Sequence, residues 1–210
     1  SVVVPSDEHI YLPRGFEPGW IYELLYTAVD PLVMGLGYVA VRDLISFLKY
    51  GERDSAGTEN PLRDGAGRLE KVYCFGRSQT GRVIRDFVYQ GFNSDAQNRP
   101  VFDGAFCHVA GAGRICNNHR WSQPVRLASY QHEDRYSYSD RFPFAYQTTE
   151  DHLTGQQAGL LKRPDTDPLW IHTQTSGEMW HRHGSLVHTD TRGDDLEQGD
   201  NVRIYLWSSS

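Results

Sequence analysis

The sequence is poor in cysteine and methionine, and it has no long hydrophobic run. Its 210 residues include three Cys and two Met. No stretch approaches the roughly 18 apolar residues that a membrane-spanning helix needs, so no membrane span is expected. Cys74 and Cys107 each lie within an apolar run, which favours buried structural thiols over a disulfide.

An excess of positive charge is also missing. The chain has 21 basic and 27 acidic residues, with a net charge of −6. A mildly acidic chain lacks the basic surface that nucleic acid requires, so no nucleic-acid partner is expected. The length and the 39% hydrophobic content fit one soluble globular domain with a substantial core.

The beginning of the chain lacks the features of a natural N-terminus. SVVVPSDEHIYLP has no initiator Met, and no basic head followed by an apolar stretch and a cleavage site. We therefore expect the start of the natural protein to be absent, together with any export signal. Cytoplasmic and exported locations both stay open.

Strand-like apolar runs alternate with helical periodicity along the chain. Alternation of this kind predicts an α/β fold with a mostly parallel sheet flanked by helices. The expected strands are Ile21–Ala28, Val72–Phe75, Phe102–Ala110, Leu169–Thr175 and Val202–Trp207.

Two amphipathic helices are expected between these runs. The first would bury Val41, Leu44, Ile45 and Leu48 and end at Gly51. The second would bury Val83, Ile84, Phe87 and Val88 and end at Gly91.

The periodicity fails between residues 113 and 168. Long structureless segments in compact domains are usually functional or disordered, and this one is too aromatic for disorder. We interpret residues 113–168 as a cap or binding loop within a single domain spanning residues 1–210. Its aromatic and imidazole side chains are Trp121, Tyr130, Tyr136, Tyr138, Phe142, Phe144, Tyr146, His119, His132 and His152.

The strongest chemical motif is KVYCFGRSQTGRV, residues 71–83. A buried strand runs into Gly76-Arg77-Ser78-Gln79-Thr80-Gly81, and a helix follows. This arrangement is typical of the nucleophile elbow, a sharp turn that lifts a Ser hydroxyl clear of the sheet. The alternative is an ordinary glycine-rich turn with a capping Ser. The motif favours Ser78 as a nucleophile, with the Gln79 N–H as an oxyanion donor at the helix N-terminus.

One feature departs from the usual elbow. The second Gly normally lies two residues after the Ser, where this chain has Thr80, and Gly81 comes one residue later. A similarly displaced glycine occurs in glucuronoyl esterases, which keep the α/β-hydrolase fold and the nucleophilic Ser.

A Ser nucleophile needs a base and an orienting acid. In α/β-hydrolases, to which the nucleophile elbow belongs, these groups follow along the chain in the order Ser, acid, His. Glu178 comes just after the Leu169–Thr175 strand, which favours it as the acid, although acids are also common at helix starts. No His follows the last strand, Val202–Trp207. His181, His183 and His188 fit better in the segment after Glu178 than in the triad.

Several segments together resemble a bacterial family of α/β-hydrolase domain proteins without an assigned substrate. They occur in family order: FEPGWIYELLYTAVDPLVMGLGYVAVRDLISFLKYG, GRSQTGRVIRDFVYQGFN, FDGAFCHVAG, NHRWSQP, SDRFPFAY, HTQTSGEMW and SLVHTDT. The resemblance implies that this chain is the C-terminal portion of the catalytic domain. It also implies a catalytic His directly after VRIYLWSSS and a second oxyanion donor from an N-terminal loop. A missing strand would leave a slot between the strands at Ile21–Ala28 and Val72–Phe75.

The favoured function is a serine hydrolase acting on a small-molecule carboxylic ester, without metal or cofactor. Ser78, Glu178 and the Gln79 N–H would carry the reaction, with a His from beyond the chain. Thioester, lactone and amide substrates would use the same groups, and the oligomeric state stays open. One alternative is a metal-dependent hydrolase using His181, His183, His188 and Asp190. Another is a hydrolase-like scaffold that binds a ligand without catalysis.

Overall fold

A computed structural model describes residues 6, 9–20, 22, 35–63, 69–115 and 141–208. The chain divides into two compact units, residues 1–32 and 33–210. In the first unit, the described residues form turns, and the rings of Phe16 and Tyr22 meet edge to face at 4.9 Å. The strand predicted at Ile21–Ala28 lies outside the described residues, apart from Tyr22.

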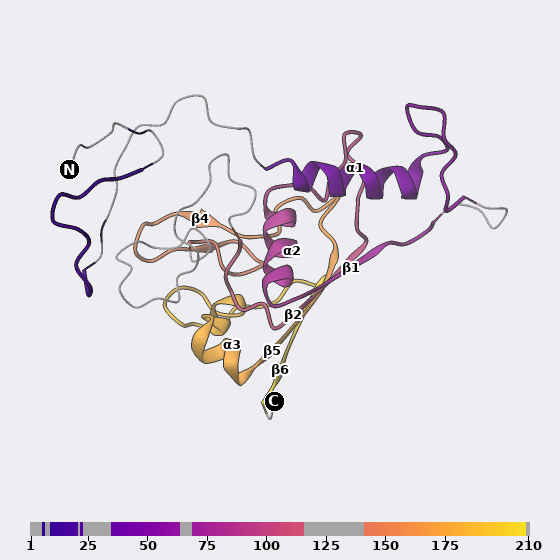
Figure 1. Cartoon of the computed structure of the whole chain (residues 1–210). Coiled ribbons are helices and arrows are strands. Elements are labelled where there is room, and N and C mark those ends of the chain that lie inside the picture. The colour runs from indigo at the N-terminus through magenta and orange to yellow at the C-terminus, as the bar shows by residue number, and fades with distance from the viewer. Residues whose placement is uncertain are drawn as a thin grey trace. The chain divides into compact units, whose positions relative to one another are not determined.

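The second unit contains a four-stranded parallel sheet (Figure 1). Its strands are β1 (Tyr73–Arg77), β2 (Gly104–His108), β5 (Leu169–Thr175) and β6 (Val202–Trp207), in the order β1-β2-β5-β6. The four predicted strands of this unit are thus confirmed. In register, Arg77 pairs with His108, and His108 with Thr173. Because all strands run the same way, their carboxyl ends share one edge of the sheet.

In the described structure, helices connect β1 to β2 and β5 to β6, and a further helix precedes β1. The helices are α1 (Gly37–Tyr50), α2 (Gln79–Tyr89), α3 (Ser176–His181) and the 3-10 turn η2 (Gly184–Val187). The stretch between β2 and β5 also holds a hairpin of β3 (Thr149–Glu150) and β4 (Gln157–Ala158). None of the helices in the described part of the chain has the length and apolarity to cross a bilayer.

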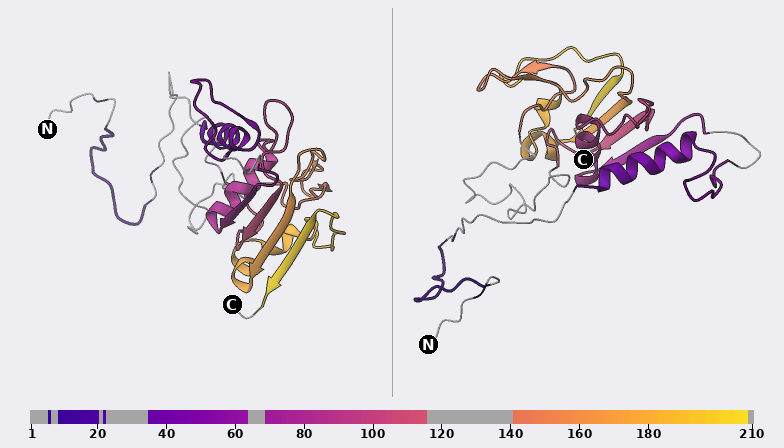
Figure 2. Two further views of the ribbon diagram at one scale, coloured as in Figure 1. Left: turned by 90° about the vertical axis from the view of Figure 1, so that its right-hand side faces the viewer. Right: turned by 90° about the horizontal axis from the view of Figure 1, so that it is seen from above.

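Helix α2 packs against β1 and β2, and α1 lies next to it (Figure 2). The core between α2 and the sheet includes Phe87, Val88 and Cys107. Cys107 is fully buried and Cys74 half-buried, and both are free thiols, as the sequence predicts. Gly91, with φ of +93°, ends α2 as predicted. The Gly91 N–H binds the Val88 carbonyl and the Phe92 N–H binds the Phe87 carbonyl, which is a Schellman motif.

The buried face predicted for α1 is partly wrong. Val41 and Leu44 are exposed, whereas Ser46 and Lys49 are buried. Ser46 donates a hydrogen bond to Asp95 (2.6 Å), and Lys49 forms an ion pair with Asp103 (2.6 Å). These two polar contacts therefore decide which face of α1 is buried. Pairing the buried Lys49 cation with a carboxylate outweighs covering two aliphatic side chains.

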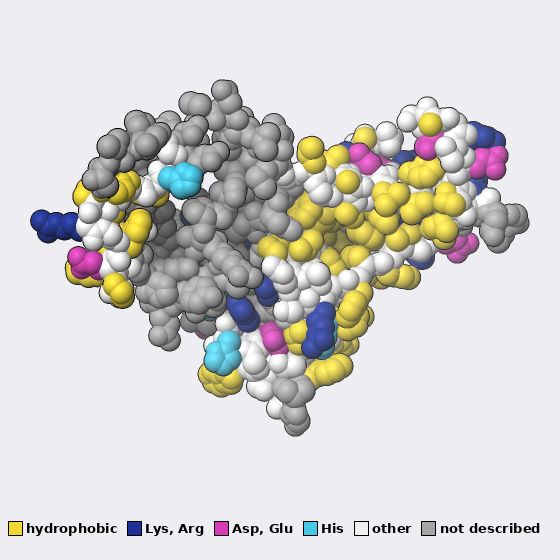
Figure 3. Space-filling model, in the orientation of Figure 1, with side chains coloured by type: hydrophobic (Ala, Val, Ile, Leu, Met, Phe, Trp, Pro, Cys, Tyr) yellow, Lys and Arg dark blue, Asp and Glu magenta, His cyan; other side chains and the backbone are white. Residues whose placement is uncertain are grey.

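The sheet face opposite α2 carries exposed apolar side chains. Their residues are Tyr73, Phe75, Leu169, Ile171, Tyr205 and Trp207. Parallel sheets are normally covered on both faces, so this exposed face departs from the usual pattern. Hydrophobic side chains are also prominent at the surface beside α1 (Figure 3).

Candidate active site

Ser78 occupies the turn between β1 and α2 in a strained conformation. Its φ of 52° and ψ of −116° are unusual for a residue with a side chain. The residue is exposed, and its side chain makes no capping hydrogen bond to α2. These observations fit a presented nucleophile better than a capping Ser.

Two glycines permit this turn. A Cβ on Gly76 would lie 2.5 Å from the Thr80 carbonyl oxygen. A Cβ on Gly81 would lie 2.9 Å from the Ala110 Cβ and 3.1 Å from the Gly76 oxygen. The segment around Ala110 therefore approaches the turn most closely at residue 81, and this explains why the second glycine lies three residues after Ser78.

Thr80 closes the turn at the position where other elbows have glycine. Its hydroxyl accepts a hydrogen bond from the Arg77 N–H (2.8 Å) and lies 2.8 Å from the Arg77 carbonyl, to which it donates. Thr80 is exposed, so its side chain meets no steric barrier. The threonine therefore stabilises the turn in place of a second small residue.

The main chain around Ser78 fixes the orientation of the turn. The Ser78 N–H donates to the carbonyl of His108 at the end of β2 (2.8 Å). Within the described residues, no acceptor binds the Gln79 N–H at the N-terminus of α2. This N–H and the helix dipole can therefore serve an oxyanion above the turn.

Glu178 lies at the same sheet edge, beyond the end of β5. It is the third residue of α3, and its Oε2 accepts a hydrogen bond from the Thr175 N–H (2.9 Å) and from the Thr175 hydroxyl. This is a capping box, so the helix-start role weighed for Glu178 is present. Both contacts use Oε2, so Oε1 lies outside the capping box.

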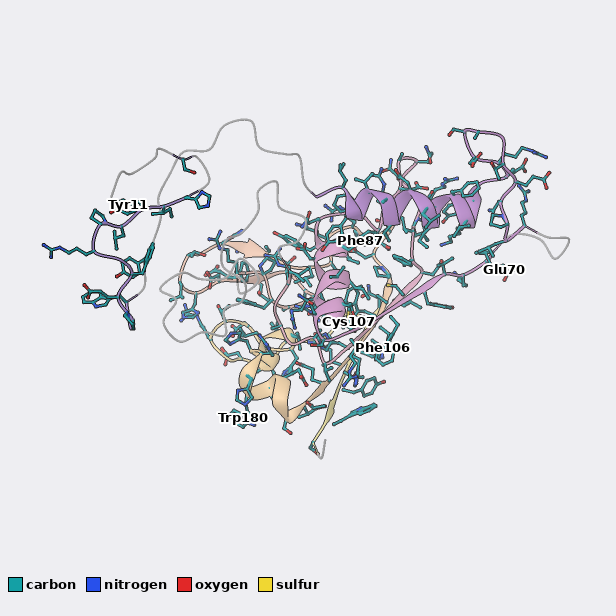
Figure 4. All side chains as sticks on the ribbon, in the orientation of Figure 1. Tyr11, Glu70, Phe87, Phe106, Cys107 and Trp180 are labelled. Carbon is teal, nitrogen blue, oxygen red and sulfur yellow. The ribbon has the colours of Figure 1, made fainter. Side chains whose placement is uncertain are left out.

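His108 is a neighbour of the turn that sequence reasoning missed. It lies on β2, between the strand that leads to Ser78 and the strand that leads to Glu178. Its Nδ1 is 2.7 Å from the Thr173 hydroxyl, and its ring packs 5.6 Å from that of Trp207. Cys107 faces α2 and Phe106 lies on the other side of the strand (Figure 4). Strand alternation therefore places His108 on the Phe106 side, and only the strand register reveals its place beside Ser78.

The histidines at the end of α3 and after it do not assemble a metal site. In the described ranges, no three His, Cys, Asp or Glu side chains lie close enough to share an ion. Asp190 instead accepts hydrogen bonds from the backbone N–H groups of Arg192 and Asp194, which lowers the pKa of its carboxyl. The His181, His183, His188 and Asp190 alternative therefore gains no support from the geometry.

The aromatic stretch at 113–168 is partly core. Tyr146 is fully buried and packs 4.8 Å from the Trp170 ring, and Phe144 contacts the same core. These two side chains therefore support the fold, and the interpretation of residues 113–168 as a cap or binding loop stays a prediction. Residues 116–140 lie outside the described residues, and with them Trp121, Tyr130, Tyr136, Tyr138, His119 and His132.

Comparison with known proteins agrees with this architecture. No curated protein and no solved structure matches the chain. The model of the alpha/beta hydrolase domain family matches residues 7–206, nearly the whole chain. Together with the parallel sheet and the strained Ser at the strand-to-helix turn, this match shows that the chain belongs to the alpha/beta hydrolase domain family.

Proposed function

We propose that the protein is a serine hydrolase that cleaves carboxylic esters. The family suggests hydrolase activity. The conformation of Ser78 carries the finer proposal, because a strained, exposed Ser at a strand-to-helix turn is the feature that an acyl-transfer nucleophile requires.

In the proposed reaction, the Ser78 hydroxyl attacks the ester carbonyl carbon and forms a tetrahedral intermediate. The Gln79 N–H donates a hydrogen bond to the oxyanion. A His, oriented by Glu178, takes the Ser78 proton. The intermediate then collapses, its bond to the alcohol oxygen breaks, and the His gives the proton to the leaving alcohol, which leaves the acyl-enzyme on Ser78. Water then attacks the acyl-enzyme by the same route and releases the acid.

The proposed base lies beyond residue 210, as the family resemblance implies. In this arrangement, a His that follows β6 would lie at the same sheet edge as Ser78 and Glu178. Glu178 would reach the His through Oε1 while Oε2 holds the capping box.

The test is hydrolysis of p-nitrophenyl acetate and butyrate. For this and later experiments, the protein is expressed with everything its gene encodes on either side of residues 1–210. Ser78→Ala should lower kcat by at least about 10⁴-fold, since removing a triad nucleophile costs roughly 10⁶-fold in kcat. Ser185→Ala serves as the control and should retain activity. Undiminished turnover by Ser78→Ala would remove the proposal.

A further inference from the structure

Arg85 is the most unusual buried charge in the described structure. Its side chain lies in the second half of α2 with a relative exposure of 0%. The guanidinium donates to three carbonyls: Gly113 (3.1 Å), Ala112 (2.7 Å) and Phe144 (2.5 Å). It also lies 4.9 Å from the centre of the Tyr146 ring, and its Nη1 has no hydrogen-bond partner among the described residues.

No carboxylate among the described residues pairs with Arg85. Buried charges are normally paired with an opposite charge, because leaving a buried ion uncompensated is costly. Two other charged groups lie near Arg85. Arg114 is 3.9 Å from Asp86, and both are largely buried. The three groups together carry a net charge of +1 when Asp86 is ionised.

The position of Arg85 on α2 relates this charge to Ser78. Helix α2 begins at Gln79, directly after Ser78, and Arg85 is its seventh residue. The separation along the axis is roughly 10 Å at 1.5 Å per residue. Helical side chains also lean toward the N-terminus, which brings the guanidinium closer to the Ser78 turn.

The charge of Arg85 acts on other groups in this region. Burial lowers the pKa of His172 well below its usual range, and Arg85 lowers it further. Burial raises the pKa of the Cys107 thiol, and Arg85 opposes that rise. The Cys107 thiol lies 3.4 Å from the carbonyl of Gly81, in the first turn of α2. The electrostatic influence of Arg85 therefore extends toward the turn that holds Ser78.

We propose that Arg85 is an electrostatic support for the oxyanion, its buried and uncompensated charge adding to the N–H groups and dipole of α2. It touches no substrate and acts through the field behind the helix N-terminus. This inference rests on the proposed function of Ser78. For a unit charge about 10 Å away in a protein interior, the effect on the rate is roughly tenfold.

The experiment compares variants of opposite electrostatic sign, using p-nitrophenyl butyrate and rates normalised to sites labelled by a fluorophosphonate. Arg85→Gln removes the charge but keeps amide donors, and should lower kcat about tenfold with KM changed less than threefold. Asp86→Asn removes the neighbouring negative charge and should raise kcat about twofold to threefold at pH 7.5. A boronic acid forms a tetrahedral anion on Ser78. It should bind about tenfold more weakly to Arg85→Gln and about twofold to threefold more tightly to Asp86→Asn.

Asn93→Leu is the matched structural control. The Asn93 side chain is buried and donates to the carbonyls of Phe102 (3.0 Å) and Thr166 (2.6 Å), but it carries no charge. This variant should lower the unfolding midpoint while leaving kcat per labelled site unchanged.

Three results would overturn the inference. In the first, Arg85→Gln keeps kcat within twofold of the parent. In the second, Asp86→Asn fails to raise kcat, and this variant decides alone if Arg85→Gln does not fold. In the third, Asn93→Leu loses kcat as much as Arg85→Gln. Loss of the Ser78 dependence of hydrolysis would instead refute the proposed function, so the two failures are distinguishable.

Discussion

At the scale of single residues, the Ser78 turn depends on one hydroxyl group and on two glycines, which have no side chain. The Thr80 hydroxyl binds both the N–H and the carbonyl of Arg77. Gly76 and Gly81 leave room where a Cβ would meet other atoms below 3.0 Å. The sequence pattern predicted the turn. The reason for the displaced glycine, which is the close contact of residue 81 with Ala110, could be found only from the structure.

The first prediction concerns Thr80. Thr80→Val should lower the free energy of unfolding by about 1 kcal/mol, because two hydrogen bonds of an exposed hydroxyl are lost. It should also slow fluorophosphonate labelling of Ser78, since the turn is less firmly held. Thr80→Ser keeps the hydroxyl and is the control, with labelling close to that of the parent. Equal labelling rates for the Val and Ser variants would contradict this role.

The second prediction concerns Gly81. Gly81→Ala places a methyl group 2.9 Å from the Ala110 Cβ, so it should lower the free energy of unfolding by about 1–3 kcal/mol. Adding Ala110→Gly should recover part of that loss, as measured by urea denaturation. Gly37→Ala at the start of α1 is the control, because a Cβ there meets nothing within 4 Å. Additive losses in the double variant would show that the contact is unimportant.

At the scale of elements, the sequence predicted positions better than faces. Strands β5 and β6 and the ends of both long helices agree with the hydrophobic pattern. The buried face of α1 does not, because Ser46 and Lys49 meet acids from a distant loop and strand boundary, at Asp95 and Asp103. Local periodicity contains no information on such long-range polar contacts. The same limit hid the burial of Arg85 within α2.

Three loops share one construction that the sequence analysis did not detect. In each loop, an Asp side chain accepts the N–H groups two and four residues later, and a residue with positive φ stands three residues later. The loops begin at Asp54, Asp95 and Asp190. The repeated feature is an Asp at the start and Gly or Asn at the fourth position, residue types that suit such turns.

The third prediction uses Asp95, whose loop anchors α1. Burial would raise the pKa of this carboxyl, but hydrogen bonds from Ser46 and Arg99 outweigh it and lower the pKa to about 2. A lowered pKa stabilises the folded state above about pH 4, and this stability is lost as the pH falls from 4 to 2. Asp95→Asn should flatten that part of the stability profile in urea denaturation. An unchanged acid slope would contradict the assignment.

The fourth prediction uses Asp86, which joins α2 to α1 through the Tyr38 hydroxyl (3.1 Å). Burial raises its pKa to about 6, against the opposing effects of Arg114, Tyr38 and Gln90. A raised pKa favours the folded state below about pH 4, and that contribution is lost as the pH rises from 4 through 6. Asp86→Asn should remove this decline, giving a flatter curve of unfolding free energy between pH 4 and 7. A decline that persists in the Asn variant would assign it to another group.

At the scale of the whole molecule, the parallel sheet brings the proposed groups to one edge. Ser78 follows β1, Glu178 follows β5, and β2 lies between them with His108. The order of the proposed nucleophile and the proposed acid along the chain is that of the alpha/beta hydrolase fold. The position of Glu178 directly after β5 could be predicted from the sequence, whereas its hydrogen bonds to Thr175 required side-chain geometry.

The central claim is that Ser78 is the nucleophile, and covalent labelling tests it most directly. The full product of the gene is treated with a fluorophosphonate, digested and mapped by mass spectrometry. The account predicts a single adduct on the peptide containing Ser78, and no adduct in Ser78→Ala. Labelling at another residue, or none in a folded protein that hydrolyses esters, would contradict it.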